Sequence, residues 1–160
     1  MKRKEFCIAG EAYTLELCVG NYPYELLLLA DETQEAIDKY LMLSDVYVLK
    51  GKDINKAVFC LFKISADVLE LKNIAVHTTL QGKGIGSILI EEILTIAQGQ
   101  GYKELIVGTA TCGLDQIRFY ERNGFIKYGI RENFFIDNYK DPIIENGQQL
   151  IDMIMLKRSV

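Results

Sequence analysis

The stretch LQGKGIGSILIEEILTIAQGQG, residues 80–101, decides the fold of this chain. From Ile85 to Ala97, apolar residues recur at steps of three and four, which predicts a helix that begins near Gly84. The breaker Gly99-Gln100-Gly101 ends this helix. Because an apolar run precedes the stretch, its first three glycines occupy a turn between a strand and a helix.

The strand before the turn is DVLELKNIAV, residues 67–76. Side chains alternate between the two faces of a strand. We therefore expect one face to carry Glu70, Lys72, Ile74 and Val76, and the other to carry Leu69, Leu71, Asn73 and Ala75.

Two short helices are predicted near the start of the chain. Residues 5–19 are compatible with a strand or an irregular arm. Pro23 suits the first turn of a helix that runs to about Ala30. Asp31 is a candidate N-cap for a second helix over ETQEAIDKYLML, residues 32–43. A carboxylate at this position can accept hydrogen bonds from the free N–H groups of the first turn.

The other predicted elements are mostly strands. Runs rich in β-branched and aromatic residues predict strands, and a segment with helical spacing that ends at a glycine predicts a helix. We expect a hairpin from 46–49 and 57–64, a central strand over 103–109, a short helix over 113–125 that Gly124 ends, and two closing strands over 125–136 and 149–157.

Length and composition predict one domain, residues 1–160, with 49% hydrophobic residues. No apolar stretch approaches the roughly 18 residues of a membrane span, and no signal peptide is evident, so we expect a cytoplasmic protein. The four cysteines form no CxxC pair and the chain has one histidine, so we expect neither a disulfide scaffold nor a metal site. A net charge of −4 argues against a nucleic-acid partner.

The glycine turn is a candidate phosphate site. The first turn of a helix has unpaired backbone N–H groups and a partial positive charge. Gly82, Gly84 and Gly86 would let a pyrophosphate approach these groups, and Lys83 adds a cation. A plain glycine-rich loop is the alternative. The Walker and G-x-G-x-x-G patterns are both absent, which disfavours ATP and NAD.

Two motifs resemble one known family. Gln81-Gly82-Lys83-Gly84-Ile85-Gly86 is similar to the acyl-CoA signature of the GNAT superfamily, the GCN5-related N-acetyltransferases, and FYERNGF at 119–125 resembles its second hallmark. The resemblance implies an α/β (α+β) fold: a mixed, mostly antiparallel sheet with a splayed central strand pair and helices on both faces. It also implies acetyl-CoA as co-substrate and transfer of its acetyl group to a primary amine by direct attack.

The resemblance also implies roles for individual residues. The backbone of Ile74, Ala75 and Val76 should bind the pantetheine arm, and Gln81, Gly82, Lys83, Gly84, Ile85, Gly86 and Ser87 should bind the pyrophosphate. Tyr120 should protonate the leaving thiolate, although it could instead be a core aromatic. Gly113 stands where many members have an asparagine, and Gln116 is a candidate substitute.

A base is needed because a protonated amine has no lone pair with which to attack a thioester. The resemblance points to Glu70, with a surface ion pair to Lys72 as the alternative. Glu25, Asp137 and Asp152 are weaker candidates, and a base acting through ordered water is another option. We interpret His77 as a solvated loop residue without a catalytic role. Cys112 has no evident base nearby that could activate its thiol.

The C-terminal segment should determine the acceptor. Closing strands would place Phe134, Phe135, Asp137, Tyr139 and Asp152 around the cleft, although the aromatics could be core and the acids surface. The acceptor could be a small molecule or a protein amine. A non-catalytic acyl-CoA-binding or interaction module is the alternative function, and a homodimer through an exposed sheet edge is a further expectation.

Overall fold

A computed structural model describes residues 3–160, and its centre is one eight-stranded sheet. The strand order is β1-β2-β3-β4-β5-β6-β10-β7, and every neighbouring pair is antiparallel except β5 and β6. The strands are β1 (Arg3–Ile8), β2 (Glu11–Leu17), β3 (Ser44–Gly51), β4 (Ile54–Lys63), β5 (Val68–Val76), β6 (Glu104–Ala110), β7 (Ile126–Arg131) and β10 (Met153–Ser159). A separate small hairpin joins β8 (Ile144–Glu145) and β9 (Gln148–Gln149).

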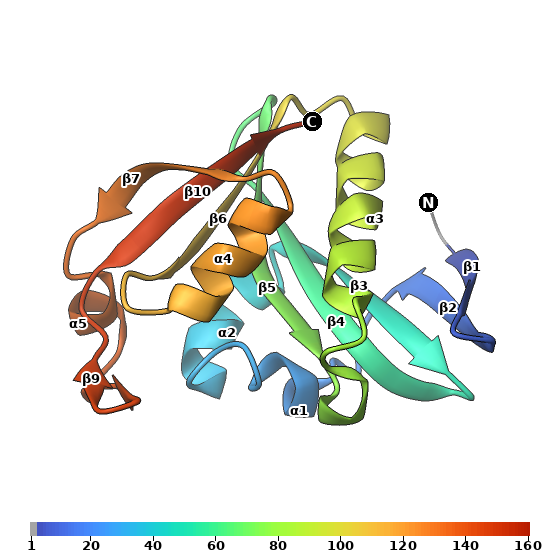
Figure 1. Cartoon of the computed structure of the whole chain (residues 1–160), viewed down its shortest axis with the longest axis horizontal. Helices are drawn as coiled ribbons and strands as arrows, with labels where there is room; N and C mark the ends of the chain where they lie inside the picture. Colours follow the sequence, from blue (N-terminus) through green and yellow to red (C-terminus); the bar gives the residue numbers. More distant parts are fainter. Residues whose placement is uncertain (1–2) are drawn as a thin grey trace.

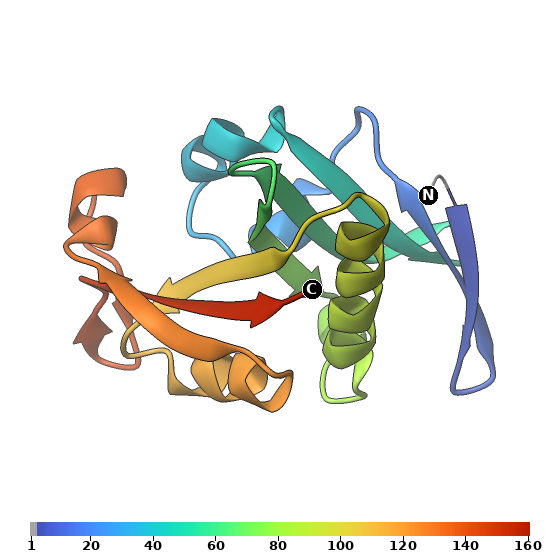
Figure 2. The same ribbon diagram turned by 90° about the horizontal axis from the view of Figure 1, so that it is seen from above.

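Helices cover both faces of this sheet, as predicted (Figure 1). Figure 2 shows α3 (Ile85–Gly99) and α4 (Leu114–Arg122) on one face, and α1 (Tyr24–Leu27) and α2 (Gln34–Leu41) on the other. The short helix α5 (Phe134–Asn138) lies near the β8–β9 hairpin, and a 3₁₀ turn (Thr78–Leu80) precedes the glycine turn. Within the described chain, no helix has the length and apolarity needed to cross a membrane.

Two buried clusters hold these layers together. Ile90 and Ile93 of α3 are fully buried against Leu71 of β5 and its neighbours, whereas Ile37 of α2 packs with Val58 on the opposite face. Truncating one such side chain to alanine typically costs about 2–5 kcal/mol. The sheet is therefore fixed from both sides.

The parallel pair β5 and β6 separates partway along its length. Val68–Leu71 of β5 pairs with Glu104–Val107 of β6, and no pairing continues beyond Leu71 and Val107. β4 follows β5 to its end at Val76, so the separation opens only on the β6 side. The predicted splayed pair is confirmed, and it leaves one side of β5 without a partner strand.

A β-bulge at Lys72 makes the expected face assignment of β5 wrong. Leu61 of β4 pairs with Leu71, but the next residue, Cys60, pairs with Asn73, so Lys72 is the extra residue. A bulge inserts one residue and reverses the alternation beyond it. Leu69, Leu71, Ile74 and Val76 accordingly pack on the α3 face, whereas Asn73 and Ala75 lie on the face of α1 and α2.

Two local predictions near the first helices are corrected. The cap of α2 is Thr33, whose hydroxyl accepts from the N–H of Ala36 at 3.1 Å. Asp31 instead accepts hydrogen bonds from Tyr40 and Tyr139. Helix α1 ends at Leu27, so the turns that continue to residue 30 are not helical.

The predicted closing strand over 125–136 is also corrected. β7 ends at Arg131, and Asn133 adopts a left-handed conformation with φ 55° before helix α5 begins. Asparagine tolerates this conformation better than most residues. Its backbone N–H donates to Asp152 Oδ1 at 2.8 Å, which fixes the turn. Residues 134–136, which were expected on the strand, therefore lie in helix α5.

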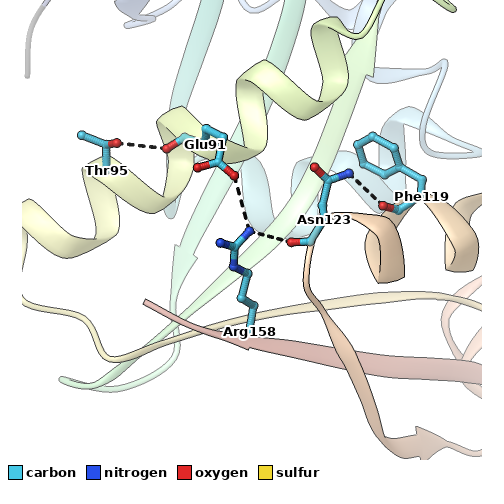
Figure 3. Close-up of polar contacts among 5 residues, drawn as sticks. All are labelled: Glu91, Thr95, Phe119, Asn123 and Arg158. Carbon is cyan, nitrogen blue, oxygen red and sulfur yellow. Dashed lines mark hydrogen bonds and ion pairs between the residues drawn. The ribbon is translucent and has the colours of Figure 1, made fainter.

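Arg158 of β10 connects the two helices on the α3 face (Figure 3). Its Nη1 donates to the carbonyl of Asn123 at 2.6 Å, just after α4, and lies 3.5 Å from Oε1 of Glu91 in α3. Asn123 in turn donates to the carbonyl of Phe119 at 2.8 Å. These contacts fix the end of α4 that follows Tyr120.

Candidate active site

A cavity of about 440 Å³ lies where β5 and β6 separate. Its walls come from the loop between α1 and α2, from α2, β5, β6 and α4, and from the segment after β7. Ile74, Gln116 and Tyr120 line it together with Glu70. The separated strands thus create a pocket that contains both predicted catalytic residues.

The backbone of β5 is oriented toward the separation at two of the three predicted residues. His77 donates its N–H to Lys56 of β4 at 2.8 Å. Since backbone groups of successive strand residues point to opposite sides, those of Ala75 also face β4, whereas those of Ile74 and Val76 face the gap. The Gln81 side chain donates to the Val76 carbonyl at 3.0 Å. Gln81 thereby holds the loop against the end of β5.

The glycine turn lies at the start of α3, outside the cavity lining. Gly84 is the N-cap of α3, with φ 77°, and a Cβ there would meet no atom within 4 Å. Lys83 and Ser87 are exposed beside it. Gly86 has a different role, because a Cβ there would lie 3.0 Å from the Phe119 ring of α4. The turn therefore presents open backbone, and Gly86 allows α3 and α4 to approach closely.

Tyr120 of α4 is buried, with 7% of its surface exposed, and it lines the cavity. Its ring packs edge-on against Phe119 and Phe125. Burial raises the pKa of its hydroxyl above the ordinary value of 10.0, because a charged phenolate would lose solvation. The hydroxyl therefore carries its proton at neutral pH.

Glu70 of β5 is buried between two cations. Its Oε1 lies 3.3 Å from Nη1 of Arg131, and its Oε2 lies 3.3 Å from Nζ of Lys72. Oε2 accepts no hydrogen bond from the described residues. The pair with Lys72 is thus not on the surface, since the Glu70 side chain is only 4% exposed.

The weaker base candidates do not line this cavity. Glu25 and Asp137 are exposed, and Asp152 accepts the backbone N–H of Asn133. Cys112 and His77 also lie outside the lining. Among the carboxylates predicted as bases, Glu70 is the one that the fold brings together with Tyr120.

Gln116 occupies the space beside Gly113. Gly113 is the N-cap of α4, and its N–H donates to the carbonyl of Ala110 at 2.9 Å. The Oε1 atom of Gln116 lies 3.2 Å from the position that a Cβ of residue 113 would take. Both residues line the cavity. The Gln116 amide thus stands where a side chain at position 113 would begin.

One part of the cavity lining is acidic. Asp31 accepts hydrogen bonds from the hydroxyls of Tyr40, at 3.0 Å, and Tyr139. Burial and this carboxylate raise the pKa of both tyrosines, so both remain donors. Loss of solvent, followed by the carboxylates of Glu145 and Asp31, raises the pKa of Glu32 to about 7.

The C-terminal segment contributes aromatic walls, whereas the acidic residues expected beside them, Asp137 and Asp152, lie outside the cavity lining. Phe134, Phe135 and Tyr139 line the cavity, with the Phe135 and Tyr139 rings stacked at 5.8 Å. Sequence reasoning missed most of the charged and amide side chains that line the cavity. They come from separate segments and carry no motif, and only Asn73 stands as a polar residue within an apolar strand. The missed residues are Asp31, Glu32, Lys39, Asn73, Arg131 and Glu145.

Comparisons with known proteins agree with this architecture. The model of the acetyltransferase (GNAT) family matches residues 28–125. The uncharacterized N-acetyltransferase YvbK of Bacillus subtilis (strain 168) is 35% identical over 83% of this chain and 86% of its own length. The chain therefore belongs to the GNAT family of acetyltransferases.

Two solved structures have the same fold along nearly their whole length. A GNAT family acetyltransferase from Elizabethkingia anophelis with acetyl-CoA bound is 37% identical, with a TM-score of 0.88 over 92% of this chain and 98% of that one. A Bacillus subtilis acetyltransferase in complex with CoA is 32% identical, with a TM-score of 0.83 over 91% and 97%. Both proteins carry the cofactor type that the glycine turn implies.

Proposed function

We propose that this protein transfers the acetyl group of acetyl-CoA to a primary amine by direct attack, without a covalent enzyme intermediate. The observation that carries this proposal is the separation of β5 from β6 beside Tyr120. It leaves the backbone groups of Ile74 facing a gap that ends at a protonated hydroxyl. A pantetheine arm carries amides that can pair with such a strand edge.

The two ends of the cofactor would meet different parts of the site. The pyrophosphate would lie on the N-terminus of α3, where Gly82 and Gly84 leave the backbone open and Lys83 adds positive charge. The thioester would lie in the cavity near Tyr120 and Gln116. The N-terminus of α3 follows β5 after one short loop, so a single extended molecule can contact both.

The chemical step requires two protons to leave the ammonium nitrogen and one to reach the sulfur. Glu70, directly or through water, accepts a proton from the ammonium, and the free lone pair attacks the thioester carbonyl carbon. A carbon–nitrogen bond forms, the carbon–sulfur bond breaks, and the thiolate takes its proton from Tyr120. The attached nitrogen loses its second proton as the amide forms, which allows Tyr120 to be reprotonated. The products are the acetylated amine and CoA.

The test is thiol release from acetyl-CoA in the presence of amines, with the acetylated product detected by mass spectrometry. Amine-dependent release and a product heavier by one acetyl group would support the proposal. Binding of acetyl-CoA without release for any amine would instead favour the non-catalytic acyl-CoA-binding module. A failure to bind acetyl-CoA would reject both.

A further inference from the structure

The acidic side of the cavity has no cation paired with it. No lysine or arginine within residues 3–160 forms an ion pair with Asp31, Glu32 or Glu145. Lys39 also lines the cavity, but its Nζ donates to the Asn138 carbonyl at 3.2 Å. Among the described residues, these three carboxyl groups therefore line the cavity without a paired lysine or arginine.

Asn73 provides a second and independent sign of a missing donor. Its Nδ2 donates to the carbonyl of Leu27 at 3.0 Å and to the hydroxyl of Tyr40 at 3.1 Å. The Leu27 carbonyl can only accept, so the nitrogen must be on that side, and Oδ1 must be the other atom. Asn73 is 4% exposed and lines the cavity, and within the described chain its Oδ1 has no hydrogen-bond partner.

An unpaired buried acceptor costs about 1–3 kcal/mol when nothing donates to it. Asn73 connects through Tyr40 to Asp31, so the free oxygen and the carboxylates belong to one continuous hydrogen-bonded wall. The free Asn73 oxygen and the carboxylates would both be satisfied by one kind of partner, a positively charged group with N–H donors. The stacked rings of Phe135 and Tyr139 add faces that favour a cation.

Another part of the cavity lining, around Glu70, has the reverse balance. There, Glu70 is flanked by Lys72 and Arg131, which gives this trio one net positive charge. A molecule that extends from this side to the acidic side therefore meets opposite potentials at its two ends. The reacting amine, which must be neutral to attack, belongs near Glu70. A second group that stays protonated belongs near the three unpaired carboxyl groups.

We propose that the acceptor is a diamine or polyamine, whose second, charged ammonium group is held by Glu32, Glu145, Asp31 and Asn73 Oδ1. This inference rests on the proposed function and names its substrate class. Asp31 is fixed by two tyrosines, whereas Glu32 and Glu145 lie on exposed segments and can adjust to the ligand. The wall selects the acceptor, and the Glu70 side supplies the chemistry.

Three matched amines test this selection by thiol release at saturating acetyl-CoA. The compounds 1,4-diaminobutane, 1-aminobutane and 4-aminobutanoate share one reacting amine and differ in the far group, which is cationic, apolar or anionic. We expect kcat/KM to fall in that order, by about fivefold to tenfold from the diamine to the monoamine. The same kcat/KM for the diamine and the monoamine would overturn the inference, while leaving the transferase function in place.

The double variant Glu32→Gln with Glu145→Gln locates the effect. It should raise KM for the diamine by about tenfold and lower kcat/KM for the monoamine much less. Glu35→Gln, an exposed carboxylate on α2 outside the cavity, is the matched control. Equal losses for the diamine and the monoamine would overturn the assignment of these residues.

Calorimetric titration of the CoA-bound protein with each amine tests the cation site even if no amine is acetylated. Tighter binding of 1,4-diaminobutane than of 1-aminobutane, lost in the double variant, would uphold the cation site. In that case the absence of thiol release would count against the proposed function alone. Equal or no binding of both amines would overturn the inference.

Discussion

Oε1 of Gln116 lies 3.2 Å from the point where a Cβ of Gly113 would stand. An amide from the first turn of α4 thus fills the space that a side chain at its N-cap would otherwise enter. The relationship couples the two positions, because a larger residue at 113 must displace Gln116. It also provides a polar group beside the proposed thioester position.

We predict that Gln116→Ala weakens the use of acetyl-CoA, raising its KM by about fivefold to tenfold, the effect of losing one hydrogen bond. Adding Gly113→Asn to Gln116→Ala should recover part of this loss, whereas Gly113→Asn alone should clash with Gln116. Steady-state kinetics at fixed amine measure both. Gln98→Ala, at an exposed site on α3, is the control. A KM unaffected by Gln116→Ala would remove the residue from the cofactor site.

Tyr120→Phe should lower kcat by about 10²- to 10⁴-fold, because the variant lacks the proton donor for the leaving thiolate. The ring and its packing remain, so the dissociation constant of acetyl-CoA should change little. Tyr128→Phe, on the exposed face of β7, should behave as the wild type. Retention of the full rate in Tyr120→Phe would show that Tyr120 is only a core aromatic.

Gly84→Ala should be strained although there is space for the methyl group, because Gly84 has φ 77°. A left-handed conformation costs an alanine about 1–2 kcal/mol. Gly99→Ala is the matched control, since Gly99 also has open space but lies in the helix without a positive φ. Urea unfolding should show a loss for Gly84→Ala and a gain of up to about 1 kcal/mol for Gly99→Ala. Equal effects at the two sites would contradict the strained turn.

The raised pKa of the Glu32 carboxyl predicts that the stability of the protein depends on pH. This pKa is raised from 4.5 to about 7 in the folded protein by partial loss of solvent and by the neighbouring carboxylates of Glu145 and Asp31. The folded state therefore binds more protons than the unfolded state between these values, so this contribution is present at low pH and is lost as pH rises through about 7.

The variant Glu32→Gln isolates that contribution. Because its side chain stays neutral, its stability relative to the wild type should increase between pH 5 and pH 8. Urea unfolding at both pH values measures the difference, with Glu35→Gln as the control. A difference between Glu32→Gln and the wild type that does not change with pH would contradict the shifted pKa.

Local patterns predicted most of the fold. Helical spacing located α3, and the two motifs placed the glycine turn before β6 and Tyr120 after it in the sequence. The bulge at Lys72 was not predictable, because it depends on how β5 pairs with β4 rather than on the composition of β5. The same holds for Asn133, whose left-handed turn depends on a hydrogen bond to Asp152, nineteen positions away.

The acceptor side of the site was mostly beyond sequence reasoning. The sequence predicted Asp31 as a helix cap because its local neighbours allow that role. In the structure, two distant tyrosines donate hydrogen bonds to it instead. Arg131 and Glu145 approach Glu70 and Glu32, respectively, only after the C-terminal segment folds back onto the sheet. The cofactor motifs are contiguous in the sequence, whereas the residues of the acceptor side come from scattered segments.

The most direct test of the central claim is thermal unfolding with acetyl-CoA and, separately, with ADP. ADP has the pyrophosphate but lacks the pantetheine arm that would lie along β5. Acetyl-CoA at about one hundred times its dissociation constant should add about 2.7 kcal/mol of stability, and ADP at the same concentration should add much less. An equal shift with ADP, or no shift with acetyl-CoA, would contradict a pantetheine site between β5 and β6.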